Sequence, residues 1–270
     1  MRMTRINIAL GAVMALLVGA TWVVAHDSWV QTNTNLVRVG DVVFFDLMLG
    51  NHGNEHRDFR LAGKVDLASS RLELIEPDGS RHDLEPSLVD QGMAPKEGYW
   101  AGRFRTSKPG VHMIVQTSEQ VVSYAPKRSI KSAKTFFLAS RSLDQVPHDA
   151  GGYDRVLGHG LELVPLTNPV TPMGPGSAIR VQLLRNGRPL ANATISFIPR
   201  GQTLKEGFDE KYQRKTDADG IASFEPDDAN YFLIVAHHDD DTEKGSGYDS
   251  TKYSATLTVY VPAICPCCPE

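Results

Sequence analysis

The feature that most constrains this chain is a two-residue alternation of apolar and polar side chains, in short runs separated by Gly, Pro, Asn and Asp. Residues 71–75, 99–106 and 178–184 alternate in this way, and such a period places the apolar side chains on one face of a β-strand. The mostly apolar runs 41–49 and 231–236 are typical of buried strands. No amphipathic helical pattern longer than two turns is present. The sequence therefore predicts an all-β protein of antiparallel sheets.

The predicted strands fall into two groups, each large enough for a β-sandwich. We expect an N-terminal β-sandwich over residues 26–140 and a C-terminal Ig-like β-sandwich over residues 161–262. The polar, glycine-containing stretch 141–160 is typical of a linker. With residues 1–25 as a signal peptide and 263–270 as a Cys-rich tail, the predicted fold is two tandem antiparallel β-sandwich domains.

The first 25 residues have the pattern of a secretion signal. Two basic residues, Arg2 and Arg5, precede an apolar run that ends at Ala25, where small residues suit cleavage. We expect cleavage between Ala25 and His26, which gives a periplasmic or secreted protein of net charge −6. The alternative is an uncleaved membrane anchor, because an apolar run of about 20 residues can span a bilayer. No Cys follows the run, so we expect no lipid anchor.

The charge and motifs of the chain restrict its function. The chain has 28 Lys and Arg against 32 Asp and Glu, a net charge of −4. Nucleic acid is therefore not an expected partner, because phosphate binding needs a basic surface. The sequence contains no Gly-rich phosphate loop, no Gly-x-Ser-x-Gly elbow and no His-Glu-x-x-His pattern. We therefore expect the protein not to be an enzyme.

The three Cys residues, Cys265, Cys267 and Cys268, all lie within the last six residues. An exported chain without Cys in its body has no internal disulfide framework, so burial must supply its stability. Clustered thiols suit Cu(I) or Zn. A loosely ordered chain end without a function is an equally good interpretation.

His26 becomes the N-terminal residue if the signal is cleaved after Ala25. Its free amine and its imidazole Nδ1 then close a chelate ring on a transition metal, and nitrogen ligands of this kind suit Ni(II), Cu(II) and Zn(II). The alternative is that cleavage leaves a His there by chance. His26 is the first candidate ligand on this argument.

Other His residues are candidate partners of His26. His52 and His56 fall in a Gly-containing loop after the strand predicted at 41–49, and loops held by a sheet often carry binding groups. Chance explains their spacing equally well. His112 falls within a predicted strand, where a single His more often has a structural role.

His237 opens the densest group of potential ligands, His237-His-Asp-Asp-Asp241, directly after the strand predicted at 231–236. Alternation along that strand places His237 and His238 on opposite faces, so only one of them can point to a given site. The acidic residues that follow either attract cations or form a solvated loop. The predicted metal ligands are His26, His52, His56, His112 and His237.

Several segments spread over the mature chain share their pattern with a known family. They are Ala25-His-Asp-Ser-Trp29, Leu157-Gly-His-Gly-Leu-Glu-Leu-Val-Pro-Leu-Thr-Asn-Pro169, Asn186-Gly-Arg-Pro-Leu-Ala-Asn-Ala193, Thr216-Asp-Ala-Asp-Gly-Ile-Ala-Ser-Phe224 and residues 231–237. In these segments the chain resembles the bacterial family called domain of unknown function 4198. That family is associated with periplasmic parts of nickel or cobalt uptake.

The resemblance implies an exported protein that binds a divalent transition metal and delivers it to a membrane metal transporter, with His26 as a ligand. Nickel or cobalt is favoured, and copper or zinc is the alternative. Two other functions stay open. One is a cell-surface module that recognises a protein or a carbohydrate without metal. The other is a copper-handling protein with an N-terminal histidine brace, which would use the same His26.

Overall fold

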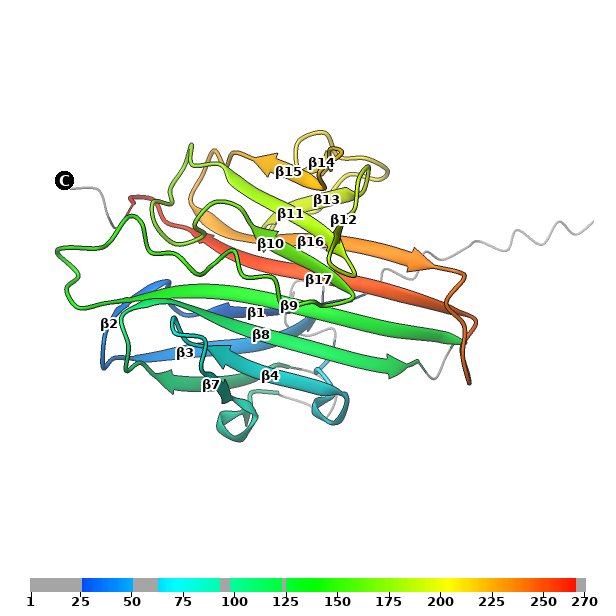
Figure 1. Cartoon of the computed structure of the whole chain (residues 1–270), viewed down its shortest axis with the longest axis horizontal. Helices are drawn as coiled ribbons and strands as arrows, with labels where there is room; N and C mark the ends of the chain where they lie inside the picture. The colour runs from blue at the N-terminus through cyan, green and yellow to red at the C-terminus, as the bar shows by residue number, and fades with distance from the viewer. Residues whose placement is uncertain (1–25, 51–62, 93–97, 123–124, 266–270) are drawn as a thin grey trace, which may run out of the picture.

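The computed structural model describes residues 26–50, 63–92, 98–122 and 125–265, and these residues fold into 17 strands and two short 3-10 helices (Figure 1). Within this part of the chain no helix is long and apolar enough to cross a membrane. The all-β prediction is confirmed. In chain order the elements are β1 (Asp27–Thr32), β2 (Leu36–Arg38), β3 (Val42–Gly50), η1 (Leu67–Ser69), β4 (Ser70–Ile75), β5 (Arg81–Asp83), η2 (Glu85–Ser87), β6 (Val89–Asp90), β7 (Trp100–Arg105), β8 (Gly110–Val121), β9 (Lys127–Ser140), β10 (Leu161–Pro165), β11 (Ile179–Arg185), β12 (Arg188–Pro189), β13 (Thr194–Pro199), β14 (Gln213–Lys215), β15 (Ile221–Phe224), β16 (Asn230–Asp240) and β17 (Ser250–Val261).

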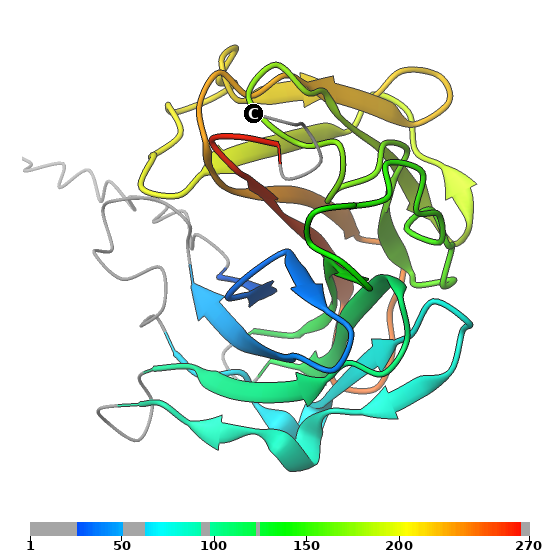
Figure 2. The ribbon, with the colours of Figure 1, turned by 90° about the vertical axis from the view of Figure 1, so that its left-hand side faces the viewer.

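One nine-stranded sheet runs through the molecule and carries a smaller sheet on each face (Figures 1 and 2). Its strands are ordered β14-β13-β16-β17-β9-β8-β4-β5, and β2 also pairs with β9. The four-stranded sheet β1-β3-β7-β6 packs on one face, and the sheet of β10, β11, β12 and β15 packs on the other. The β-sandwich prediction is confirmed.

The two faces of the long sheet carry separate cores because successive strand residues point in opposite directions. On β9, Phe136 belongs to the core beneath β10 and β11, whereas Phe137 belongs to the core beneath β1 and β3. A third, smaller cluster joins Trp29 of β1 to Leu233 and Val235 of β16. This cluster fixes the start of β1 over the C-terminal half of the chain.

The strand β9 joins the two halves of the chain. One edge of β9 pairs antiparallel with β8, and its other edge pairs in parallel with β17 and β2. These two parallel pairs lie within sheets that are otherwise antiparallel, and through the pairing of β9 with β17 both halves share one sheet. β9 ends at Ser140 and β10 begins at Leu161, with no strand at 141–160. The division into two domains stays a prediction.

Candidate functional site

His237 and Asp27 meet where β16 passes beneath the start of β1. His237 Nε2 lies 2.8 Å from Asp27 Oδ1, and the same oxygen accepts a hydrogen bond of 2.6 Å from Ser254 Oγ. His237 shares its face of β16 with Leu233 and Val235, which pack against β1. The alternation of β16 therefore directs this imidazole, and not that of the next residue, toward Asp27.

Asp27 is a buried carboxylate whose charge has three neighbours. Burial alone would raise its pKa, but His237, Ser254 and the nearby Lys131 stabilise the ionised form and hold the pKa below its usual value. An ionised carboxylate only accepts hydrogen bonds, so His237 Nε2 carries a proton, and in the neutral imidazole Nδ1 is then the nitrogen with the lone pair. The described residues offer no hydrogen-bond partner to that Nδ1. A His held in this way by a carboxylate is oriented as metal-binding His residues commonly are.

His26 directly precedes this pair, and its side chain is exposed. Lys131 Nζ of β9 donates a hydrogen bond of 2.7 Å to the His26 carbonyl oxygen and so fixes the backbone there. Burial lowers the pKa of Lys131, and the charge of Asp27 offsets this only in part. Because β1 begins at Asp27, strand alternation does not set the direction of the His26 imidazole.

A row of polar side chains crosses five strands of the long sheet at the level of His237. The strands are β14, β13, β16, β17 and β9, and three of the four steps across the row are paired residues. The fourth step, from Thr194 to His237, lies one residue beyond the pair Ile195 and Ala236 of β13 and β16. Directly opposite partners face the same side of a sheet, so the five side chains share one face. The row consists of Lys215, Thr194, His237, Ser254 and Lys131.

A hollow of about 570 Å³ lies over one end of this row. Its floor carries hydroxyl, amide and ammonium groups, and Gln213 Nε2 there donates a hydrogen bond of 2.9 Å to Ser196 Oγ. Phe208, which is 47% exposed, adds an aromatic wall. Residues that line the hollow are Thr194, Ser196, Phe208, Gln213, Lys215 and His237.

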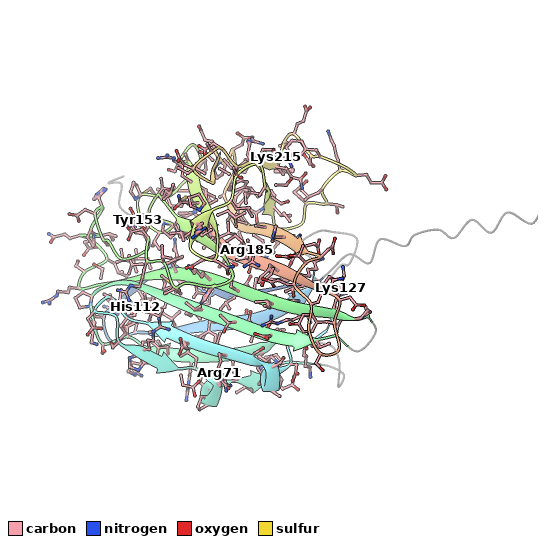
Figure 3. The ribbon with its side chains drawn as sticks, turned by 45° about the vertical axis from the view of Figure 1, so that its right-hand side comes forward. Arg71, His112, Lys127, Tyr153, Arg185 and Lys215 are labelled. Carbon is pink, nitrogen blue, oxygen red and sulfur yellow. The ribbon has the colours of Figure 1, made fainter. Side chains whose placement is uncertain are left out.

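His112, which is labelled in Figure 3, lies on β8 directly opposite Phe137 of β9. The side chain is fully buried, its Nδ1 lies 3.0 Å from the Gly110 carbonyl oxygen, and its ring stacks on Phe137 with 4.8 Å between centroids. Burial lowers the pKa of His112. Phe137 is the strand partner of His112, and Lys131 belongs to the same row as His237. These two residues stand six positions apart on β9, which is about 20 Å along a strand. His112 and His237 therefore cannot share a metal ion.

His52 and His56 lie outside the described residues, as do Cys267 and Cys268, and Cys265 is partly buried. The acidic run after His237 does not begin a loop at once, because β16 continues to Asp240. The Asp240 carboxylate accepts hydrogen bonds from Thr242 and from the Glu243 amide, which is a turn-forming role. In the part of the chain that the structure describes, no three His, Cys, Asp or Glu residues are grouped to hold a metal.

Three residues of the site, Asp27, Lys131 and Ser254, were not identified from the sequence. Asp27 stands next to His26 in the Ala25–Trp29 segment, so a carboxylate beside the expected N-terminus was the one signal available. Lys131 and Ser254 give no local signal, because only the pairing of β9 with β17 brings them to this place.

The fold and this geometry define a class: a β-sandwich protein with a carboxylate-held imidazole at the start of its first strand. The family described as Domain of unknown function (DUF4198) matches residues 23–240. This chain belongs to that family. A search of curated proteins found no match to this chain.

Solved structures with a similar arrangement are distant. The D0-D1 domain of intimin matches at 10% identity with a TM-score of 0.23, over 86% of this chain and 97% of that chain. A DUF4785 family protein from Legionella pneumophila matches at 14% identity with a TM-score of 0.30, over 77% of this chain and 50% of that chain. The ectodomain of mouse nectin-like molecule 4 matches at 13% identity with a TM-score of 0.22, over 88% of this chain and 65% of that chain.

Proposed function

We propose that this protein is an exported transition-metal-binding protein, periplasmic or secreted, which captures a divalent ion and delivers it to a membrane uptake system. Nickel or cobalt is the favoured metal, with copper or zinc as the alternative. The observation that supports the proposal is the 2.8 Å contact of His237 Nε2 with Asp27, one residue from His26. It leaves His237 Nδ1 as a donor beside the expected N-terminus.

The donor set that we propose is made of nitrogen atoms. Removal of residues 1–25 would add the amine of His26 to its imidazole, and His237 Nδ1 would supply a third nitrogen. Nitrogen ligands suit the later divalent ions of the first transition row. Asp27 would act as a positioning residue that keeps His237 in the tautomer with Nδ1 unprotonated. His52 and His56 stay predicted ligands.

The test is metal titration of the secreted protein. Its N-terminal residue is first identified by mass spectrometry, and Ni, Co, Cu and Zn are then titrated by calorimetry. We expect His26→Ala and His237→Gln each to lower the affinity for the preferred metal at least about tenfold. His148→Gln is the matched control, because His148 is exposed in the segment between β9 and β10. Unchanged affinity in both site variants would overturn the proposal.

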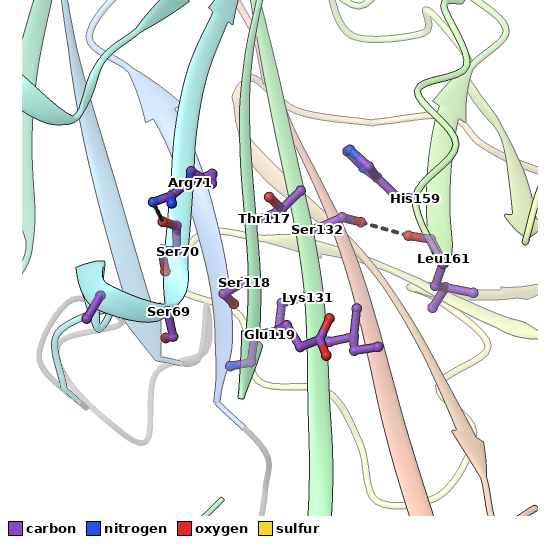
Figure 4. A pocket seen from close by; sticks show the side chains of 13 residues that line it. Ser69, Ser70, Arg71, Thr117, Ser118, Glu119, Lys131, Ser132, His159 and Leu161 are labelled. Atoms are coloured by element: carbon purple, nitrogen blue, oxygen red, sulfur yellow. Dashed lines mark hydrogen bonds between the residues drawn. The ribbon is translucent and has the colours of Figure 1, made fainter. Parts of the chain in front are cut away.

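A second candidate function, recognition of a carbohydrate without metal, is favoured by a separate hollow of about 510 Å³ on the opposite face of the sheet (Figure 4). Arg71 of β4, Thr117 of β8 and Ser132 of β9 line it, together with His159 from the segment before β10. Hydroxyl and charged groups of this kind bind sugar hydroxyls. Binding of a panel of soluble oligosaccharides to the wild type and to Arg71→Ala tests this candidate. Equal binding by both proteins would show that this hollow is not a carbohydrate-binding site.

A further inference from the structure

We propose that the metal reaches this site as a complex with a small carboxylate-bearing chelator, which the hollow beside His237 receives. The inference rests on the proposed function and specifies the form of its cargo. Three properties of the described residues lead to it: the charge around His237, the number of ligands that the chain offers, and the lining of the hollow.

The charge around His237 does not suit a bare dication. Lys131 and Lys215 stand at the two ends of the polar row, and Lys252 lies near enough to Lys131 to help lower the pKa of that side chain. Asp27 is the carboxylate that contacts His237, and it is already shared between His237 and Ser254. A dication that carries two or three carboxylates is neutral or negative, so the same lysines attract it.

A second acidic residue near the row is also engaged. Asp239 lies on the same face of β16 as His237, and its Oδ1 is 3.9 Å from Lys127 Nζ of β9. This pair offsets part of the charge of Asp239, and the charged neighbours that lower the pKa of Asp27 are His237 and Lys131. In the lining of the hollow itself, Lys215 supplies a positive charge that a carboxylate of the ligand can meet.

Within the described residues, the number of protein ligands near His237 is small for the proposed metals. Zinc usually takes four ligands, and octahedral coordination requires six. The described residues provide no group of three His, Cys, Asp or Glu side chains at one point. A chelator that remains bound to the ion would supply ligands beside those of His237, the N-terminal residue and the predicted ligands His52 and His56.

The hollow has the size and the lining that such a chelator requires. Its volume of about 570 Å³ falls in the range of small-molecule sites. The hydroxyls of Thr194 and Ser196 and the ammonium of Lys215 are hydrogen-bond donors for carboxylate oxygens. Lys215 Nζ makes one long hydrogen bond of 3.4 Å to the Asn192 carbonyl oxygen, which leaves further N–H groups for a ligand. Phe208 would pack against the carbon skeleton of the chelator.

Equilibrium dialysis with two labels tests the inference. The mature protein is dialysed against Ni(II) alone, against equimolar Ni(II) and citrate, and against citrate alone, with the metal and the citrate both counted. We expect Ni(II) with citrate to bind at least about tenfold more tightly than Ni(II) alone, with both labels retained in equal amounts.

Variants separate the metal from its chelator. We expect Lys215→Gln to weaken binding of the citrate complex at least about fivefold and to leave the affinity for Ni(II) alone unchanged, because a bare ion has no group for Lys215 to bind. His237→Gln should weaken both. Lys244→Gln is the matched control, an exposed lysine that does not line the hollow.

The outcomes distinguish the two proposals. Retention of Ni(II) without citrate, at an affinity that citrate does not raise, would overturn the inference and leave the proposed function standing. Retention of neither label by the wild-type protein would overturn both. Equal loss of both labels in Lys215→Gln and Lys244→Gln would show that general surface charge, and not the hollow, draws the complex.

Discussion

Lys134 of β9 and Glu162 of β10 form an ion pair that is closed to solvent, with 2.5 Å between Nζ and Oε1. The Glu162 carboxylate also accepts hydrogen bonds from the backbone amides of Leu157, Gly158 and His159. One carboxylate thus fastens the end of the segment between β9 and β10 to the central strand. Lys134 therefore links the two halves of the chain at a second place, apart from the pairing of β9 with β17.

Removal of one partner of this pair should destabilise the fold strongly. Burial alone would raise the pKa of Glu162, but Lys134 and the backbone amides lower it, so the carboxylate is ionised. In Glu162→Gln the ammonium of Lys134 stays buried without a counter-charge. We expect the free energy of unfolding, measured with urea, to fall by about 3–5 kcal/mol.

An exposed ion pair provides the control for Glu162→Gln. Arg81 and Glu73 are 2.7 Å apart, and their side chains are 51% and 39% exposed. Arg81→Gln should cost less than about 1 kcal/mol. The double variant Lys134→Met/Glu162→Gln should recover part of the loss because it removes the unpaired charge. Equal effects of Glu162→Gln and Arg81→Gln would contradict the prediction.

Glu76 should make the protein sensitive to acid. Its side chain is only 2% exposed and lies 2.6 Å from Lys108 Nζ and 3.0 Å from His82 Nε2. Burial alone would raise the pKa of Glu76, but hydrogen bonds from Lys108, His82 and two Ser residues outweigh it and lower the pKa to about 2. The carboxylate therefore stabilises the fold above pH 4.5, its unfolded pKa, and this stabilisation is lost as the pH falls from 4.5 toward 2.

The variant Glu76→Gln isolates this dependence. A difference of two to three pKa units corresponds to about 3 kcal/mol, so the variant should lose about that much stability at pH 7 and less as the pH approaches 2. Urea unfolding at a series of pH values measures the difference. Glu225→Gln, at an exposed position, should run parallel to the wild type. A constant difference between Glu76→Gln and the wild type at all pH values would refute the assignment.

Gly102 of β7 should tolerate no side chain. A Cβ atom there would come within 2.6 Å of Phe45 Cε2 and 2.9 Å of Ser87 Oγ. Phe45 is 1% exposed in the core beneath β3, so its ring has no space to move away. We expect Gly102→Ala to lower the free energy of unfolding by about 1–3 kcal/mol. Gly151→Ala, where no atom lies within 4 Å, should change it by less than about 0.5 kcal/mol, and equal values would contradict this account.

The sequence predicts those strands of this fold that have one exposed face. β4 and β11 show the alternation that was expected of them, because every second side chain faces the core. β1 was missed, since all six of its residues are buried and its polar side chains find partners far along the chain. Ser28 Oγ, for example, donates to Gln116 Oε1 at 2.8 Å across 88 residues. The alternation of neighbouring residues cannot predict a partner that lies so far along the chain.

The candidate site was predictable to the same extent. The alternation of β16 correctly separated His237 from His238, because that property is local. His112 was grouped with His237 because both are His residues, and only the register of β8 on β9 shows that they lie far apart. Asp27 finds its partners 210 and 227 residues away, so its role in holding His237 arises from tertiary structure alone.

The positioning role of Asp27 leads to a further prediction about metal binding. In Asp27→Asn the charge that holds the proton on His237 Nε2 is lost, so both tautomers of His237 become populated. We expect metal affinity to fall about 10–100-fold, although neither His26 nor His237 is changed. Nitrogen NMR of the metal-free protein should show the altered tautomer, a readout that a purely structural role of Asp27 would not affect.

The control for Asp27→Asn removes a hydrogen bond to the same carboxylate but leaves its charge. Ser254→Ala deletes the 2.6 Å hydrogen bond to Asp27 Oδ1, which should cost about 1 kcal/mol of stability. Because Asp27 stays ionised, the His237 tautomer should remain that of the wild type, and metal affinity should change less than about threefold. If Ser254→Ala weakened metal binding as much as Asp27→Asn, packing at the start of β1 and not the charge of Asp27 would control the site.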